Sequence, residues 1–230
     1  MRPVIGFLGL SSPDSFAPQV AAFHQGLRET GYVEGENGAV EYRWAENDYD
    51  RLPALAADLV AHRVDVIVTQ GGNPSALAAK NATTTIPIVF MIGADPVASG
   101  LVASLARPGG NLTGFTMILR ELTAKRLELL CDLVPQAKVI GLLVKPDNPE
   151  TEGFVQDVQE AAHIKGVQFQ ILMVSDEAEI DAAFATLTQV KIGALLLGSD
   201  PFFFTRRHQI VALAARHAVP AMYDSRQYGG

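Results

Sequence analysis

The chain has 230 residues, of which 48% are hydrophobic, and a formal net charge of −7. This length and hydrophobic content are sufficient for a packed core in one large domain or two smaller ones. The negative balance, with no run of like charges, argues against nucleic acid or an anionic membrane surface as a partner.

The first half of the chain alternates short apolar runs with segments of helical periodicity. The runs are VIGFLGL, AVEYRWA, VDVIVT and IPIVFMI; the first three lead through polar loops into helical patterns, and the fourth leads into GADPVASG. Strands that alternate with helices are typical of parallel sheets covered on both faces. We expect Gly31 to end the first helix, as glycine does just past a helix C-terminus.

A break follows at ARPGGNLTGFT, residues 106–116, where two glycines and a proline interrupt the pattern. We interpret this segment as a linker between two lobes, residues 1–116 and 117–230. After the helical segment RELTAKRLELLCDLV, the strand-like runs resume with KVIGLLV, VQFQILMV, GALLLG and VPAMYD. The second half therefore repeats the first.

One short motif occurs in both halves. A strand, then Gly-x-x-Pro, then a helix is expected at Gly71 to Pro74 and again at Gly198 to Pro201. The repetition favours two similar α/β lobes, although general reuse of such turns in α/β proteins is the alternative.

The loops that follow the strands are the expected binding region, because ligands of open parallel sheets bind beyond the carboxyl ends of the strands. These loops are rich in small hydroxyl, amide and carboxylate side chains. The candidate residues are Ser11, Ser12, Gly72, Asn73, Ser75, Asp95, Asn148, Asp200, Tyr223 and Asp224.

Each of these residues also has a plainly structural interpretation. Asp95 and Asp200 precede helical segments and are candidate helix N-caps, and Ser75 is a typical helix-start residue. The run from Phe202 to Phe204 is expected to turn one ring toward a crevice or solvent, because three consecutive helical positions cannot all face one core.

The common enzyme motifs are missing from the sequence. It contains no GxxxxGK[ST], GxGxxG, GxSxG, HExxH or CxxC pattern, and its single cysteine, Cys131, falls on an expected helix. The five histidines fall inside or at the ends of expected helices, away from the loops after the strands. We therefore predict no cofactor, no metal and no enzymatic activity. An enzyme on a doubly wound fold and a cytoplasmic sensor domain stay open as alternatives.

Several longer strings resemble one known family. They include GYVEGEN, VEYRWAENDYDRLPALAADLV, TTTIPIVFMIGADPV and GLVASLARPGGNLTGFT. They are similar to substrate-binding proteins of ABC transporters, and more narrowly to the family with tryptophan- and tyrosine-binding members. The resemblance implies a type I periplasmic binding protein: two Rossmann-like lobes with parallel sheets, which capture a small solute between them and present it to a membrane permease. It also places Thr116, near the hinge, and Phe202 among the ligand residues.

The resemblance implies a periplasmic or extracellular, lipid-anchored location, although this chain carries no signal peptide. Family members also continue past the YGG at which the chain stops, so the second lobe is expected to end near its crossing back to the first. Such a truncated lobe would expose an apolar surface or a sheet edge, which predicts self-association.

An amino acid fits the candidate residues. The helix starts near Ser12 and Ser75 suit a carboxylate, and Asp95, Asp200 or Asp224 suits an ammonium group. Phe202 and Tyr223, together with the resemblance, favour an aromatic side chain on the solute.

Overall fold

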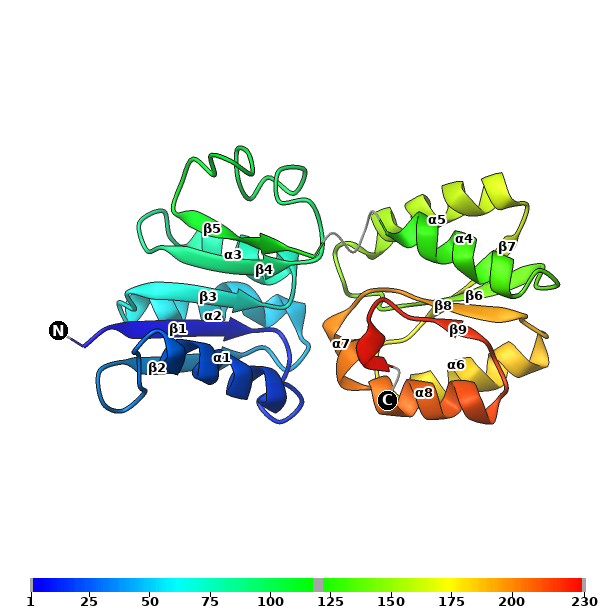
Figure 1. Cartoon of the computed structure of the whole chain (residues 1–230), viewed down its shortest axis with the longest axis horizontal. Coiled ribbons are helices and arrows are strands. Elements are labelled where there is room, and N and C mark those ends of the chain that lie inside the picture. Colours follow the sequence, from blue (N-terminus) through cyan, green and yellow to red (C-terminus); the bar gives the residue numbers. More distant parts are fainter. Residues whose placement is uncertain (1, 118–121, 229–230) are drawn as a thin grey trace. The chain divides into compact units, whose positions relative to one another are not determined.

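A computed structural model describes residues 2–117 and 122–228 of the protein. The chain divides into two compact units, Met1–Ile118 and Leu119–Gly230. The two units are described one after the other below, and Figure 1 shows the elements of each.

The first unit is a parallel sheet with helical connections. Its strands lie in the order β2-β1-β3-β4-β5, and every neighbouring pair is parallel. The elements in chain order are β1 (Val4–Gly9), α1 (Ala17–Glu29), β2 (Ala39–Trp44), a 3-10 turn (Tyr49–Arg51), α2 (Leu52–Ala61), β3 (Val66–Gln70), α3 (Asn73–Ala82), β4 (Ile88–Ile92) and β5 (Leu112–Thr116).

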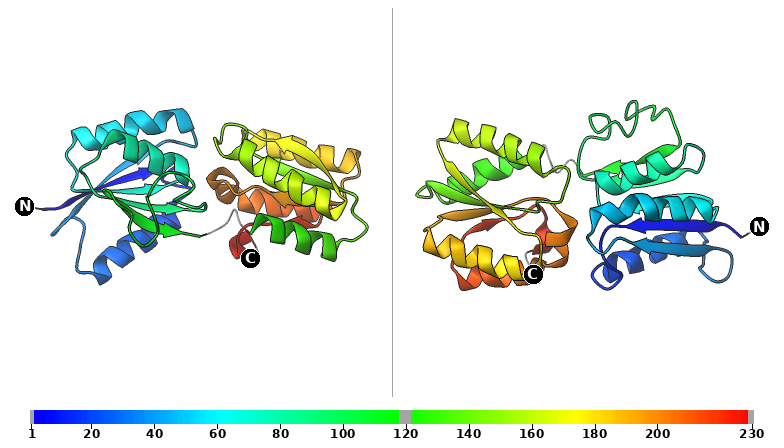
Figure 2. Two further views of the ribbon diagram at one scale, coloured as in Figure 1. Left: turned by 90° about the horizontal axis from the view of Figure 1, so that it is seen from above. Right: turned by 180° about the vertical axis from the view of Figure 1, so that it is seen from behind.

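Helices cover both faces of this sheet. Helices α2 and α3 contact each other on one face, and α1 lies on the other (Figure 2). Because both faces are covered, the central strands read as apolar runs without strict alternation. Leu8, Ile67 and Ile88 form the centre of the core and are fully buried.

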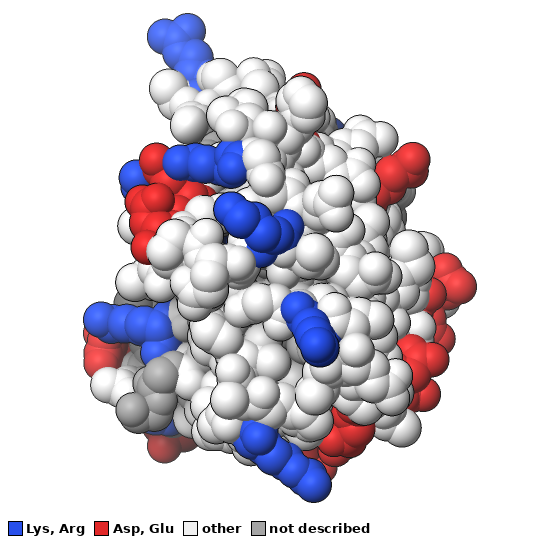
Figure 3. Space-filling view, turned by 90° about the vertical axis from the view of Figure 1, so that its right-hand side faces the viewer, with Lys and Arg blue, Asp and Glu red and all other residues white. Residues whose placement is uncertain are grey.

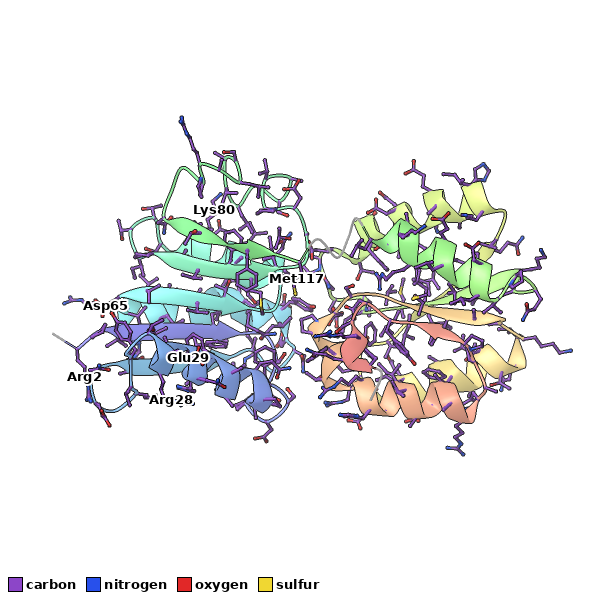
Figure 4. All side chains as sticks on the ribbon, viewed as in Figure 1. Arg2, Arg28, Glu29, Asp65, Lys80 and Met117 are labelled. Carbon is purple, nitrogen blue, oxygen red and sulfur yellow. The ribbon has the colours of Figure 1, made fainter. Side chains whose placement is uncertain are left out.

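The segment interpreted as a linker is partly a strand of this sheet. Residues 112–116 form β5, which pairs in register with β4 from Ile88 to Ile92. The two glycines at 109 and 110 belong instead to the long connection between these strands. Lys80 of α3 donates a hydrogen bond to the Gly100 carbonyl and so attaches this connection to the helix (Figure 4).

The second unit is also a parallel sheet with helical connections, and among the described residues it has four strands where the first has five. Its parallel strands lie in the order β7-β6-β8-β9. The elements are α4 (Thr123–Leu133), β6 (Val139–Val144), α5 (Thr151–Lys165), β7 (Gln168–Met173), α6 (Glu177–Gln189), β8 (Ala194–Leu197), α7 (Pro201–Thr205), α8 (Arg207–Arg216), β9 (Ala221–Met222) and a 3-10 turn (Arg226–Tyr228).

Helices α4 and α5 cover one face of the second sheet, and α6 and α8 cover the other (Figures 1 and 2). Phe184 and Phe203 are the largest fully buried side chains on the α6 and α8 side. On the face drawn in Figure 3, Lys and Arg side chains are mixed with uncharged and acidic residues. Among the described residues of that face there is no continuous basic surface.

The expected helix signals are observed. Helix α1 ends at Glu29 with Thr30 as its C-cap, and Gly31 follows with a φ of 87°. The prolines of the repeated motif both occupy the first turn of a helix, Pro74 in α3 and Pro201 in α7. Proline fits that position because its missing N–H would have no partner within the helix.

Candidate functional site

The topology of each unit defines one preferred binding position. In each sheet the second strand lies on one side of the first strand, and all later strands lie on its other side. A binding crevice forms at the carboxyl ends of the strands, at the point where the strand order reverses. In the first unit this point lies between β1 and β3, and in the second unit it lies between β6 and β8. Met117 marks the carboxyl edge of the first sheet and Asp65 its amino edge (Figure 4).

In the first unit, glycine lets the loops after β1 and β3 approach closely. Gly71 has a φ of 118°, and a Cβ at this position would lie 2.3 Å from the Leu10 Cβ and 2.6 Å from the Ser75 Oγ. Gly72, with a φ of 77°, then leads into α3. No other residue type fits at Gly71, because both the backbone conformation and the available space exclude a side chain.

Three buried hydroxyl groups surround this close approach. Ser11 follows β1, Thr69 belongs to β3 and Ser75 lies in the first turn of α3. All three side chains are almost completely buried, and their hydroxyls have no hydrogen-bond partner within residues 2–117 and 122–228. A buried polar group without a partner is costly, so such groups in a native protein call for an explanation.

The loops at residues 72–75 and 95–99 are joined through Ser99. The Asn73 Nδ2 donates to the Ser99 Oγ over 2.5 Å, and the Ser99 Oγ donates to the Asp95 carbonyl over 2.6 Å. This contact places the two loops side by side. Asp95 itself is exposed, and its Oδ1 accepts hydrogen bonds from the N–H groups of Val97 and Ala98. It therefore caps a turn and not the expected helix, because residues 96–100 form turns.

Ser12 and Thr116 are occupied by local bonds. The Ser12 Oγ lies 2.7 Å from the Ser15 Oγ, within one turn of chain. The Thr116 Oγ1 donates to the Ala94 carbonyl over 2.7 Å and ties the end of β5 to the end of β4. Both residues thus shape the edge of the sheet through their own bonds.

In the second unit, Asn148 and Asp200 meet across the point where the topology reverses. The Asn148 Nδ2 donates to the Asp200 Oδ2 over 2.8 Å. The Asp200 Oδ1 accepts from the Phe202 N–H over 2.8 Å, so this carboxylate also caps α7. Two residues expected in one site are therefore in direct contact, and Asp200 also has the capping role.

Lys145 is a buried cation at the same point of the second sheet, and the sequence analysis did not predict it as a site residue. Its side chain is 3% exposed, and its Nζ donates to the Asp147 Oδ2 over 2.9 Å and to the Ser175 carbonyl over 3.2 Å. The Nζ also lies 5.4 Å from the centre of the Phe202 ring. The available signal is a lysine placed directly after the apolar run KVIGLLV, since lysines at the ends of buried strands seldom stay unpaired.

The three phenylalanines of α7 differ in burial. Phe202 and Phe203 are buried and meet edge to face at 5.5 Å, whereas Phe204 is only partly buried, with the Arg207 guanidinium 4.9 Å from its ring centre. The ring that turns outward is thus Phe204. The expected single helix is also divided, because α7 ends at Thr205 and α8 begins at Arg207.

Asp224 and Tyr223 follow the last strand, β9. The Asp224 Oδ1 is buried and has no hydrogen-bond partner among the described residues, and Tyr223 stacks on Tyr228 with ring centres 4.6 Å apart. Burial raises the pKa of the Asp224 carboxyl, while Ser199 and the Arg126 guanidinium partly oppose that rise. Arg126, a buried residue of α4, is a second cation that the candidate list omits.

Comparison with protein families identifies the chain. The family model described as ABC transporter substrate binding protein matches residues 5–226. The chain therefore belongs to the family of ABC transporter substrate-binding proteins. This agrees with the resemblance seen in the sequence, and the predicted fold of two lobes with parallel sheets is confirmed.

Individual relatives give the same picture. A tyrosine-binding protein of Clostridioides difficile is 30% identical over 216 residues, which cover 94% of this chain and 61% of the relative. A Streptococcus pneumonia ABC domain in complex with L-Trp has a TM-score of 0.78 at 24% identity, covering all of this chain and 77% of its own. The open, ligand-free structure of a substrate binding protein with adhesive properties from Clostridium difficile has a TM-score of 0.57 at 27% identity, covering 96% and 73%. The chain thus spans about three fifths of the curated relative's length.

Proposed function

We propose that the chain is a solute-binding receptor of an ABC importer and that it binds an amino-acid-like solute for delivery to a membrane permease. Family membership supports the transport role. The tyrosine-binding relative supports an amino acid, and an aromatic one in the narrower form of the proposal. The observation that carries the site is the group of buried hydroxyls at Ser11, Thr69 and Ser75, which have no hydrogen-bond partner in the part of the chain that the structure describes.

The first unit offers donors that suit a carboxylate. The start of α3 presents backbone N–H groups without helical partners, and the Ser75 hydroxyl adds a side-chain donor in the same turn. Gly72 allows a ligand to approach the backbone, because no side chain stands in the way. A bound carboxylate would give the hydroxyls of Ser11 and Ser75 the partners that they lack among the described residues.

The second unit offers an acceptor that suits an ammonium group. The Asp224 Oδ1 is buried and unpartnered among the described residues, whereas both oxygens of Asp200 already accept hydrogen bonds. A carboxylate that loses water on burial regains stability from a cationic partner. Asp224 is therefore the candidate partner for an ammonium group in the second unit, and Asp95 is the candidate in the first unit.

The enzyme alternative has less support. Nucleophilic catalysis needs a base that is hydrogen-bonded to the attacking hydroxyl. Within the described part of the chain, Ser11 and Ser75 have no such histidine or carboxylate beside them.

We propose a location outside the cytoplasmic membrane, in the periplasm or anchored by lipid at the cell surface, because the family serves import. Within residues 2–117 and 122–228, no helix has the length and apolar character needed to cross a bilayer. Self-association stays a prediction, which light scattering over a range of protein concentrations can test.

Titration calorimetry with L-tyrosine tests the proposed site. We expect Ser75→Ala to weaken binding by about 1 kcal/mol, as for one lost hydrogen bond, and Asp95→Ala by about 2 kcal/mol if this carboxylate pairs with the ammonium. Thr30→Val is the control, because it removes a hydroxyl at the far end of α1. If both site variants fold and bind like the parent, these residues are structural caps and the site lies elsewhere.

A further inference from the structure

Lys145 is a lysine buried at the centre of the carboxyl edge of the second sheet. It directly follows β6, which lies between β7 and β8. Its side chain is 3% exposed. A buried ammonium group is costly unless it is paired, and it carries three N–H donors and no acceptor. The contacts of this group therefore show which parts of the unit it holds together.

The ammonium group contacts the connections that follow three neighbouring strands. It donates to the Asp147 carboxylate in the loop after β6 and to the Ser175 carbonyl in the loop after β7. It also lies 5.4 Å from the ring centre of Phe202, in the first turn of α7, which follows β8. One side chain thus joins three loops at the edge where the strand order reverses.

The backbone of Lys145 closes the loop that carries Asn148. The Thr151 Oγ1, at the start of α5, donates to the Lys145 carbonyl over 2.5 Å, and the Asn148 backbone N–H donates to the same carbonyl over 3.4 Å. The Asn148 Oδ1 accepts from the Glu150 N–H over 2.9 Å. The loop is therefore fixed both through its backbone and through the Asn148 side chain.

Asn148 keeps one donor in reserve. Its Nδ2 carries two N–H groups, and one of them is donated to the Asp200 Oδ2 over 2.8 Å. The other has no partner among the described residues, and the side chain is only partly buried. Because the amide is held at its oxygen and at one N–H, the remaining N–H has a fixed direction. A donor that is fixed in advance binds an oxygen atom of a ligand with a smaller loss of conformational entropy.

We propose that Lys145 is a positioning residue, which holds the loop after β6 so that the Asn148 amide presents its remaining N–H to an oxygen atom of the solute. This inference rests on the proposed function and adds a donor in the second unit to it. Both hydrogen-bond partners of the ammonium group, Asp147 and Ser175, are exposed, so water can replace Lys145 for them. Ion pairs with an exposed partner contribute little to stability. Loss of Lys145 is therefore expected to loosen the loop more than it destabilises the fold.

The first test needs no solute. Hydrogen exchange measured by ¹⁵N NMR follows the side-chain amide of Asn148, assigned by its loss in Asn148→Ser, in the parent, in Lys145→Met and in the control Lys125→Met. Lys125 is an exposed lysine of the same unit, paired with Glu128. We expect exchange to be about tenfold faster in Lys145→Met, because the loop opens more readily, and unchanged in Lys125→Met. The amide of Asn111 in the first unit, which is held by two backbone carbonyls, is the internal reference.

Two outcomes of this experiment would overturn the inference. Unchanged exchange of the Asn148 amide in Lys145→Met would show that Lys145 does not hold the loop. A Lys145→Met variant that no longer folds would show that the lysine is needed for the fold itself, and thermal melting checks this point.

The second test measures the affinity for L-tyrosine by titration calorimetry in Lys145→Met, in Asn148→Ala and in the double variant. We expect each single variant to bind about tenfold more weakly, and the double variant to bind no more weakly than Asn148→Ala, because Lys145 acts through Asn148. A merely structural role would give losses that add. Additive losses would therefore overturn the inference.

The positioning role and the proposed function can fail separately. A parent that does not bind L-tyrosine, with Asn148 exchange that responds to Lys145→Met as expected, would support the positioning role and count against the proposed function. A parent that binds L-tyrosine, with unchanged exchange in Lys145→Met, would support the proposed function and overturn the positioning role.

Discussion

The carboxyl edges of the two sheets occupy equivalent positions but differ in chemistry. At the edge of the first unit the buried polar groups are uncharged: the hydroxyls of Ser11, Thr69 and Ser75 and the amides of Gln70 and Asn73. At the edge of the second unit they include the buried charged side chains of Lys145, Arg126 and Asp200. One topology thus supports two kinds of polar edge.

Because of this difference, we expect the two edges to be sensitive to different perturbations. The first edge depends on close backbone approach, so added volume should disturb it and pH should not. The second edge depends on charges that are partly removed from water, so changes in charge or protonation should disturb it. The same substitution type is therefore expected to have different effects in the two units.

The largest expected effect is a change of size at the first edge. Gly71→Ala should lower the free energy of unfolding by about 3 kcal/mol, because it combines an unfavourable φ with a clash against Leu10 and Ser75. Urea denaturation measures this. Gly31→Ala is the control: Gly31 has a φ of 87° with open space around it, and the expected loss is about 1 kcal/mol. Equal losses in the two variants would show that close approach at Gly71 contributes nothing.

A smaller effect is expected for charge removal at the second edge. Asp200→Ala should lower the free energy of unfolding by about 2 kcal/mol, because the carboxylate caps α7 and accepts from Asn148. Asn148→Ala, which keeps the cap, should cost about 1 kcal/mol by the same denaturation assay. If the Asn148 variant were the less stable of the two, the cap would not be the main contribution of Asp200.

The smallest expected effect on stability is that of removing a hydroxyl at the first edge. Ser75→Ala should change the free energy of unfolding by less than about 0.5 kcal/mol, because its Oγ forms no hydrogen bond with the described residues. The loss of L-tyrosine affinity in the same variant would then report on binding alone. A clear loss of stability would instead show that the hydroxyl already has a partner in the free protein.

Much of the secondary structure could be predicted locally. The apolar runs became strands, and Gly31, Pro74 and Pro201 mark helix ends as expected, because these residues act through their own backbone. The strand β5 was interpreted as part of a linker, because the glycines and the proline of ARPGGNLTGFT interrupt the sequence pattern. Its identity depends on pairing with β4, which no local signal reveals.

The candidate site was predicted less completely than the fold. Loop position placed Asn148, Asp200 and Asp224 at the carboxyl edge of the second sheet, because loops after parallel strands meet there. It did not indicate that Lys145 and Arg126 are buried near the same edge, and Arg126 lies on a helix that begins far from β8 in the sequence. One of the three rings at 202–204 was expected to turn outward, and packing decided that this ring is Phe204, because Phe202 and Phe203 are buried.

The sequence by itself determined the order of strands and helices, the family and the loops in which polar groups gather, because periodicity and turn chemistry are local properties. Tertiary structure alone decided which of those polar groups accept hydrogen bonds from backbone N–H groups and which are buried without a partner among the described residues. Asp95 and Asp200 accept backbone N–H groups, whereas Ser11, Ser75 and the Asp224 Oδ1 have no partner among the described residues. The reason is that hydrogen bonding and desolvation depend on neighbours brought together by strand pairing, and these neighbours lie far apart along the chain.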